Sequence, residues 1–425
     1  MTPSPRAGLA LRIGDRVFYG WVMVAVAALG LFASGPGQSH TFSVFNQLIA
    51  RDLGLSLTDV SWAYGIATTV AAFLLPVMGR QVDTYGARKS LIFIVIGLGA
   101  ACFVFGAVAN MLWLVVGFGL LRFLGQGSMM LGSANLVAQW FTKKRGFAMS
   151  LMALGFAASI AVHPKLGQYL IATYDWRTAW FVLGGMTWVM MLPVLIVIVW
   201  DKPSALGMRP DNEPPAEGAT APELTGPTLH QALRHPSFYL LCMAWFGFSA
   251  LVTSLHYHQV NIFQFQKMDP SWATNSFGIT AISMVFFMPA VGWCCDRFRT
   301  RYMLAAGLAV QAVALVAVTF VTTVPLLVVY AVIFGLNNAF TMTLFGYLWP
   351  RYFGRKHLGR IQGTGQMVAV IGASVGPIPV SLAFDNVGDP TTTLYLTAIY
   401  PVVVAVIAVV FLATHPAVEG TEHLD

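Results

Sequence analysis

The chain has 425 residues, of which 57% are hydrophobic and only 10% are charged, and its mean hydropathy is +0.70. A soluble domain carries roughly 25% charged residues, so this composition excludes a water-soluble globular protein as well as a disordered one. The net charge of +7 does not indicate a nucleic acid partner, because the basic residues form small clusters between long apolar runs. We therefore expect an integral membrane protein surrounded by the lipid bilayer.

Long apolar runs predict the membrane-spanning helices. A helix needs about 20 apolar residues to cross the hydrocarbon layer, and lipid cannot pair with backbone groups, so such a segment must be helical. Runs of this length also exclude a barrel of short alternating strands. The twelve predicted spans lie near residues 18–42, 57–78, 90–109, 111–137, 146–171, 177–199, 236–261, 273–294, 301–322, 325–348, 361–384 and 392–413.

The first span follows two arginines, as a signal peptide does, but it is too long for one and no cleavage site follows, so we expect it to be retained. Most of the 24 Lys and Arg residues then lie in the two tails, the central loop and the even-numbered turns. Only Arg51, Arg177 and Lys267 fall on the other side. The positive-inside rule predicts a cell (inner) membrane protein with both termini in the cytoplasm.

A stretch rich in Pro, Gly and Glu, residues 201–234, predicts a flexible cytoplasmic linker. It separates an N-terminal six-helix bundle, residues 1–200, from a C-terminal six-helix bundle, residues 235–425.

The two halves repeat each other. The motif Gly-x-x-x-Asp at 79–83 recurs at 292–296, and the basic turn at 140–144 matches the one at 352–356. Matching turns at matching places in two six-helix halves indicate a transporter built from repeats.

The loop after the second span resembles the signature of the major facilitator superfamily, Gly-x-x-x-Asp-x-x-Gly-x-[Arg/Lys]-[Arg/Lys]. It is carried by Gly79, Asp83, Gly86, Arg88 and Lys89. A second motif of that family is similar to Arg122, Gly125 and Gly127 in the fourth span. The stretches FYGW, SVF, WFTKKRGFAMSLMALG, DWR and LGMRPD resemble the monocarboxylate transporter and oxalate–formate antiporter branch. The resemblance implies an all-α membrane fold with twelve transmembrane helices in two pseudo-symmetric bundles.

The signature loop predicts a conformational latch. Asp83 lies in a tight turn, where its carboxylate can pair with an arginine or cap the N-terminus of a neighbouring helix, and Asp296 repeats it in the second half. Such a contact would hold the halves in one state until it is broken. The alternative, above all for Arg88 and Lys89, is a charged turn that only fixes the topology. The predicted latch comprises Gly79, Asp83, Gly86, Arg88, Lys89 and Asp296.

In a carrier of two halves the substrate lies near the midplane, mainly against spans one, four, seven and ten. None of the 17 Asp and Glu residues falls in the middle of a predicted span, so the carboxylate proton relay of many carriers is missing. A site lined by basic groups favours an anion, in agreement with the monocarboxylates and dicarboxylates carried by the branch that the chain resembles. The basic and titratable residues within the spans are His40, Arg122, His163, Lys165, His256 and His258.

Arg122 offers a fork of donors for a carboxylate; the alternative is that it braces span four. His40 and His258 stand at equivalent positions of the repeat, and we expect them to face each other and take the coupling proton. His40 also occupies the place where proton-linked monocarboxylate carriers, which the chain resembles, have a lysine. For all three histidines of spans one and seven the alternative is a neutral ring bonded to a backbone carbonyl.

His163 stands where the twin span has a glycine, since Ser159-x-x-x-His163 matches Gly372-x-x-x-Gly376. We expect the ring to face a cavity, because an imidazole replaces a small packing residue. Lys165 either joins the site or extends outward to the membrane surface. Neutral polar residues either orient the substrate or bond neighbouring helices. Those included in the predicted site are Gln38, Gln126, Tyr257, Asn337 and Asn338.

One feature departs from the resembled branch, which places an arginine in span eight to hold the substrate. Residues 273–294 contain no Arg or Lys. Either Arg122 or Lys165 takes its place, or the substrate is not a simple carboxylate.

No motif for catalysis, metal or cofactor is found. Gly125-x-Gly127 falls inside a predicted helix, so it is not a dinucleotide turn, and there is no phosphate-binding loop for ATP. The four cysteines lack metal-ligand spacing. The sequence therefore predicts a monomeric secondary transporter for a small organic anion, by proton symport or anion exchange. The alternatives are an exporter of hydrophobic or cationic compounds, which lacks a supporting buried carboxylate, and a non-transporting sensor or receptor.

Overall fold

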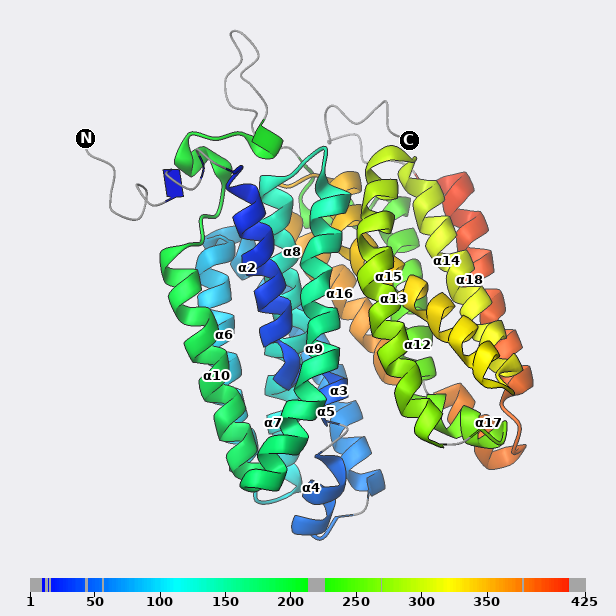
Figure 1. Cartoon of the computed structure of the whole chain (residues 1–425). Coiled ribbons are helices and arrows are strands. Elements are labelled where there is room, and N and C mark those ends of the chain that lie inside the picture. Colours follow the sequence, from blue (N-terminus) through cyan, green and yellow to red (C-terminus); the bar gives the residue numbers. More distant parts are fainter. Residues whose placement is uncertain are drawn as a thin grey trace.

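The computed structural model describes residues 10–11, 14, 17–42, 45–55, 57–212, 226–268, 270–376 and 378–412. In this part of the chain the regular structure is helical, without strands, which confirms the predicted all-α fold. Figure 1 shows two helical bundles standing side by side. Helix α2 begins and α18 ends at the same end of the molecule (Figure 1), here called the terminal end; the opposite end is the distal end.

The first bundle contains the elements before the linker. They are α2 (Gly20–Ala33), η1 (Gly35–Gly37), α3 (Ser39–Phe42), α4 (Asn46–Asp52), α5 (Leu57–Tyr85), α6 (Ala87–Gly106), α7 (Met111–Leu121), the π-helical η2 (Arg122–Ser128), α8 (Met129–Trp140), α9 (Arg145–Thr173) and α10 (Trp176–Val197).

The linker carries short elements and leads into the second bundle. The linker elements are η3 (Pro203–Leu206), η4 (Pro210–Asn212) and α11 (Leu229–Ala232). The second bundle consists of α12 (Pro236–Phe265), α13 (Pro270–Arg297), α14 (Thr300–Ala317), η5 (Val318–Phe320), α15 (Val324–Phe353), α16 (Leu358–Val375), α17 (Ile378–Asn386) and α18 (Thr391–Phe411).

Eleven helical segments among the described residues are long and apolar enough to cross a membrane. The first predicted span differs, because α2 has only 14 residues and ends before Gly35-Pro36-Gly37. Proline lacks the N–H that would continue the helical hydrogen bonds, and glycine adds backbone freedom. The chain therefore makes a 3-10 turn here and resumes as α3, so the expected continuous helix is a broken one.

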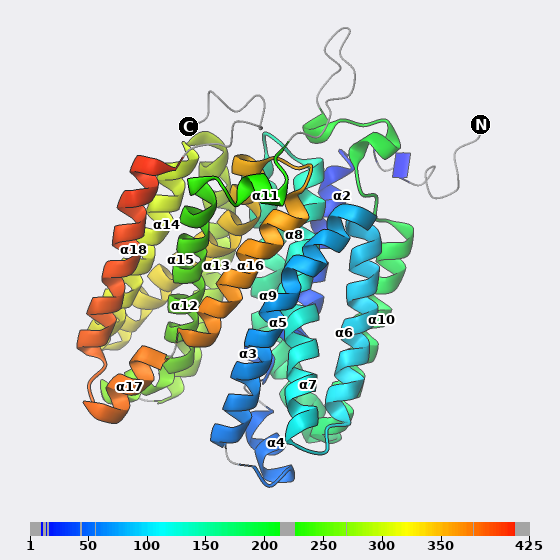
Figure 2. The same ribbon diagram turned by 180° about the vertical axis from the view of Figure 1, so that it is seen from behind.

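Two helix pairs join the halves. Helix α16 lies along α5, as Figure 2 shows, and α13 lies along α9. The two pairs are equivalent by the repeat, since each joins the second helix of one half to the fifth of the other.

Glycines let these helices touch backbone to backbone near the terminal end. A Cβ added to Gly79 would lie 2.1 Å from the carbonyl oxygen of Gly359, and one added to Gly292 would lie 2.6 Å from that of Gly146. Both distances are far below van der Waals contact, so only glycine permits either crossing. We call these two contacts the glycine crossings.

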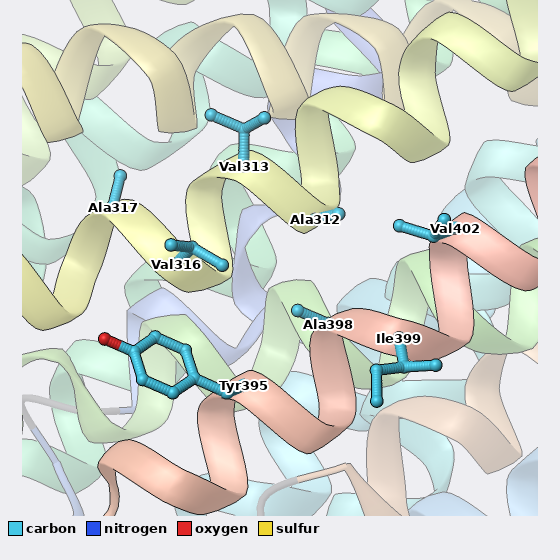
Figure 3. Close-up of a pocket in the computed structure, with 8 residues that line it drawn as sticks. All are labelled: Ala312, Val313, Val316, Ala317, Tyr395, Ala398, Ile399 and Val402. Atoms are coloured by element: carbon cyan, nitrogen blue, oxygen red, sulfur yellow. The ribbon is translucent and has the colours of Figure 1, made fainter.

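An apolar groove of about 470 Å³ lies between α14 and α18 (Figure 3). In Figure 1 these helices form the outer side of the second bundle, away from α5 and α9. Apart from the hydroxyl of Tyr395 its lining is hydrocarbon, and large apolar side chains such as Val313 and Val402 are exposed there. This is the surface expected of helices that face lipid, and it is not the predicted substrate site.

Candidate functional site

Arg122 opens a π-helical segment in the middle of the fourth predicted span. Single turns of this kind are frequent at functional sites. The glycines inside η2 let neighbouring chains approach, since a Cβ on Gly125 would lie 2.7 Å from the Cα of Gly37. The break in the first span and the π-helical segment in the fourth are therefore packed directly on each other.

The side chain of Arg122 is only 2% exposed. Its Nη1 donates to the carbonyl oxygen of Gly37 at 3.1 Å and to the hydroxyl of Ser39 at 3.2 Å. The guanidinium lies 4.9 Å from the ring centre of Tyr64, whose hydroxyl is 2.7 Å from the Ser39 hydroxyl. Its Nε has no hydrogen-bond partner among the described residues. These contacts tie the fourth span to the break in the first, and they leave the buried Nε donor for another group.

Two other predicted residues belong to the same two segments. Gln38 is buried and its Nε2 donates to the hydroxyl of Ser34 at 3.0 Å, across the 3-10 turn. Gln126, in η2, is half-buried, and its Oε1 has no partner within the described part of the chain. Tyr64 was not predicted, because nothing in the sequence distinguishes a tyrosine in span two that faces an arginine from one that faces lipid.

His40 and His163 are joined through one serine. The Nε2 of His40 lies 3.1 Å from the hydroxyl oxygen of Ser159, and the Nδ1 of His163 lies 3.1 Å from the same oxygen. The ring centres are 6.4 Å apart. This chain of polar groups runs from α3 to α9, and we call it the His–Ser–His chain.

The environment of His163 differs from our expectation of a ring facing a cavity. The side chain is 4% exposed and lies directly over Gly35, where an added Cβ would be only 2.4 Å from the ring. The imidazole thus occupies the volume that Gly35 leaves free. In the second half the arrangement is reversed. The repeat equivalent of His163 is a glycine, Gly376, which packs on the backbone of Ala250 in α12.

Across the interface between the halves, the neighbour of His40 is His256. The groups in electrostatic range of His40 are His163, His256 and Arg122. The ring of His256 is stacked on Phe277 with the ring centres 5.9 Å apart and lies 4.6 Å from that of Phe334.

His258 was expected to face His40, but it is 2% exposed and lies 6.0 Å from the ring of Phe384 in α17. Two residues along a helix are about 200° apart around its axis, which explains why only one of the two histidines of α12 turns to the other half.

The remaining predicted residues are dispersed. Asn337 is fully buried, and neither its Oδ1 nor its Nδ2 has a partner in the described structure; a buried unpaired amide of this kind suits a ligand or a water molecule. The Nδ2 of Asn338 donates to the carbonyl oxygen of Phe334 at 2.8 Å. Lys165 is exposed. The side chain of Tyr257 lies outside the described residues.

Two of the predicted latch residues, Asp83 and Asp296, cap helices of the opposite half. Asp83 accepts from the N–H groups of Gly359 at 2.7 Å and Arg360 at 2.9 Å, in the first turn of α16. Asp296 accepts from the N–H groups of Gly146 at 2.7 Å and Phe147 at 2.9 Å, in the first turn of α9. A carboxylate is favoured at a helix N-terminus because the unpaired N–H groups and the helix dipole are positive there.

The other residues of the signature loop act within the first half. Arg88 donates from Nε to the carbonyl oxygen of Leu195 at 3.1 Å and from Nη2 to that of Ile196 at 2.6 Å. Its N–H donates to Asp201 at 2.7 Å, beside Gly86, which has a φ of 84°. Lys89 is exposed. Of the predicted latch residues, Asp83, Gly79 and Asp296 therefore contact the opposite half, whereas Arg88 ties the loop to α10.

A model of the Major Facilitator Superfamily matches residues 20–298 and 261–423. MFS-type transporter 1 of Ophiocordyceps sp. (strain BCC 1869) is 23% identical over 67% of this chain and 60% of its own length. Monocarboxylate transporter 6 of Mus musculus is 23% identical over 39% of this chain and 36% of its own length. The match thus covers less than two thirds of the length of each of these relatives. The crystal structure of the human organic anion transporter MFSD10 (TETRAN) matches with a TM-score of 0.68 and 14% identity, over 91% of this chain and 98% of that one.

Proposed function

The chain belongs to the Major Facilitator Superfamily and is a membrane transporter, and on this basis we propose that it carries a small organic anion, a monocarboxylate, by alternating access of its two halves. A non-transporting sensor finds no support in these comparisons.

The observation that carries the proposal is the charge of the groups gathered between the halves. Arg122, His163 and His256 lie within electrostatic range of His40. The two carboxylates of the latch stand near the C-terminal ends of α5 and α13, at the terminal end. A buried guanidinium without a carboxylate partner favours an anionic ligand. The relatives named monocarboxylate transporters and the structural neighbour named an organic anion transporter agree with this choice.

We also propose that the terminal end faces the cytoplasm, because the basic turns of both halves are gathered there. With both latches closed at this end, substrate would enter the interface from the distal end. Rotation of the halves would then break the two caps and release the substrate on the other side.

The His–Ser–His chain supports proton coupling at His40 with His163 as its partner. Two charged imidazoles 6.4 Å apart repel each other by about 2–3 kcal/mol at an effective dielectric constant of ~20. The pair therefore holds at most one excess proton, which the serine hydroxyl can pass between the rings. Anion exchange without a proton is the alternative mechanism.

The test of substrate class is the thermal stability of the purified protein with a panel of small carboxylates, at about pH 5.5 and about pH 7.5. A ligand that binds only the folded state raises its melting temperature by mass action. We expect stabilisation by a carboxylate, larger at the lower pH. Stabilisation by cationic amphiphiles alone would contradict the anion proposal and favour an exporter of such compounds.

His40→Gln and His163→Gln are each expected to abolish the stimulation of uptake by an inward proton gradient, because either change interrupts the chain through Ser159. Glutamine keeps the size and polarity of the side chain but cannot carry the proton. The measurement is uptake into proteoliposomes with and without the gradient. His258→Gln is the matched control, and gradient-stimulated uptake in the His40 and His163 variants would refute their role in coupling.

A further inference from the structure

The start of the linker is anchored to the first half by one carboxylate. Asp211, in η4, accepts from the N–H groups of Thr142 at 2.7 Å, Lys143 at 2.7 Å and Lys144 at 3.2 Å. These three N–H groups lie in the turn that leads into α9, directly before the N–H groups that Asp296 caps from the second half. Two carboxylates therefore bind successive parts of the same backbone, one from the linker and one from the opposite half.

The backbone of Asp211 is held in an unfavourable conformation. Its φ is 57°, and that of Asn212 is 58°, in the left-handed region that costs a non-glycine residue free energy. Charge-assisted hydrogen bonds to three N–H groups offset this cost. The anchor is thus a specific contact and not a chance approach of a surface loop.

A cluster of arginines spans the interface beside this anchor. Arg145 of the first half is 4% exposed and lies within electrostatic range of Arg351 and Arg355 of the second half. The Nη1 of Arg355 donates to the carbonyl oxygen of Gln139 at 3.2 Å, across the interface. Three like charges brought together here oppose closure of the terminal end.

Asp211 supplies negative charge to this cluster. It is in electrostatic range of both Arg145 and Arg355. Burial lowers the pKa of Arg355, and the charge of Asp211 acts against that change. The counter-charges of the cluster are thus Asp296 from α13 and Asp211 from the linker.

We infer that Asp211 is a positioning residue of the transport cycle: it holds the turn before α9 in the geometry that Asp296 caps, and it offsets the repulsion among Arg145, Arg351 and Arg355 when the terminal end closes. The linker thereby sets the balance between the two states of the carrier. This role goes beyond the proposed function, because it does not depend on which substrate is carried.

The test compares Asp211→Asn with Asp201→Asn. Both aspartates lie in the linker region and cap a backbone N–H, but Asp201 binds Arg88 within the first half and lies outside the arginine cluster. Spin labels introduced by Tyr85→Cys in α5 and Tyr302→Cys in α14, in a Cys294→Ala background, report the distance between the halves at the terminal end; both tyrosines are exposed.

We expect a roughly fivefold fall in the ratio of closed to open molecules for Asp211→Asn, and the wild-type distribution for Asp201→Asn. Adding Arg351→Gln to Asp211→Asn should restore most of the closed population, because one repelling charge is removed. An unchanged distance distribution in folded Asp211→Asn would overturn the inference, as would opening that Arg351→Gln does not reverse. Neither result bears on the identity of the substrate, which the carboxylate panel tests separately.

Discussion

Arg122→Met is expected to lower uptake of the carboxylate roughly 100-fold while the protein remains folded. The change removes a fixed positive charge bonded to the broken first span, and it leaves the buried Gly37 carbonyl without its donor, while the Ser39 hydroxyl keeps its contact with Tyr64. An unsatisfied buried polar group costs about 1–3 kcal/mol, so the break should also lose its defined geometry. Uptake into proteoliposomes and the melting temperature measure the two effects separately.

Arg177→Met provides the matched control. The Nη1 of Arg177 likewise donates to two backbone carbonyl oxygens, of Gly106 at 3.1 Å and Val108 at 2.6 Å, and its Nη2 binds Asp52 at 2.7 Å. It lies at the distal end, outside the candidate site. We expect Arg177→Met to lower the melting temperature with much less loss of uptake. Arg122→Lys keeps the charge without the fork and should give partial activity. Wild-type uptake by Arg122→Met would remove Arg122 from the proposed site.

Gly79→Val is expected to prevent the terminal end from closing and so to stop transport. Its Cβ would lie 2.1 Å from the carbonyl oxygen of Gly359, and backbone on both sides of the contact cannot yield as a flexible side chain does. Because the crossing exists only when the halves meet at this end, the open state is spared. The variant should therefore fold and accumulate in the open state.

Gly65→Val in the same helix is the control, because no described atom outside its chain neighbours and the adjoining helix backbone lies within 4 Å of the Cβ that it would add. A cysteine at Ser150, which is fully buried beside Gly292, reports opening through its reaction with a membrane-impermeant maleimide. We expect rapid labelling with Gly79→Val and slow labelling with Gly65→Val. Equal labelling rates in the two variants would show that the glycine crossings do not limit closure.

The sequence predicted the long helices well, because hydropathy over about 20 residues is a local property. Hydropathy did not reveal the break at Gly35-Pro36-Gly37, because it is averaged over about 20 residues and three residues between apolar segments change that average little. The role of Asp83 as a helix cap was among the predicted alternatives. The helix that it caps was not, because α16 lies in the other half and follows about 275 residues later in the chain.

The sequence predicted several residues of the candidate site, but it did not predict how their side chains are arranged. His40, Arg122 and His163 do lie together. The structure brings His256 into electrostatic range of His40. Counting residues between repeats pointed to His258 instead, because such a count does not give the rotation of a helix about its axis, and neighbouring positions differ by about 100°. Lys165 was included on charge alone, and charge does not tell which way a long side chain extends.

The way in which Asp83 and Asp296 bind has a consequence for the evolution of this family. Both aspartates bind backbone N–H groups, which every residue except proline possesses. The N–H donors at positions 147 and 360 are therefore kept when the side chain there changes to any residue except proline, while 146 and 359 are restricted to glycine by the crossings. The side-chain partners of the two aspartates are weaker: Arg360 Nε lies 3.9 Å from Asp83, and Arg145 is only within electrostatic range of Asp296. The contact that joins the two halves should thus leave mainly conserved single positions in an alignment, with weaker co-variation between positions 83 and 360.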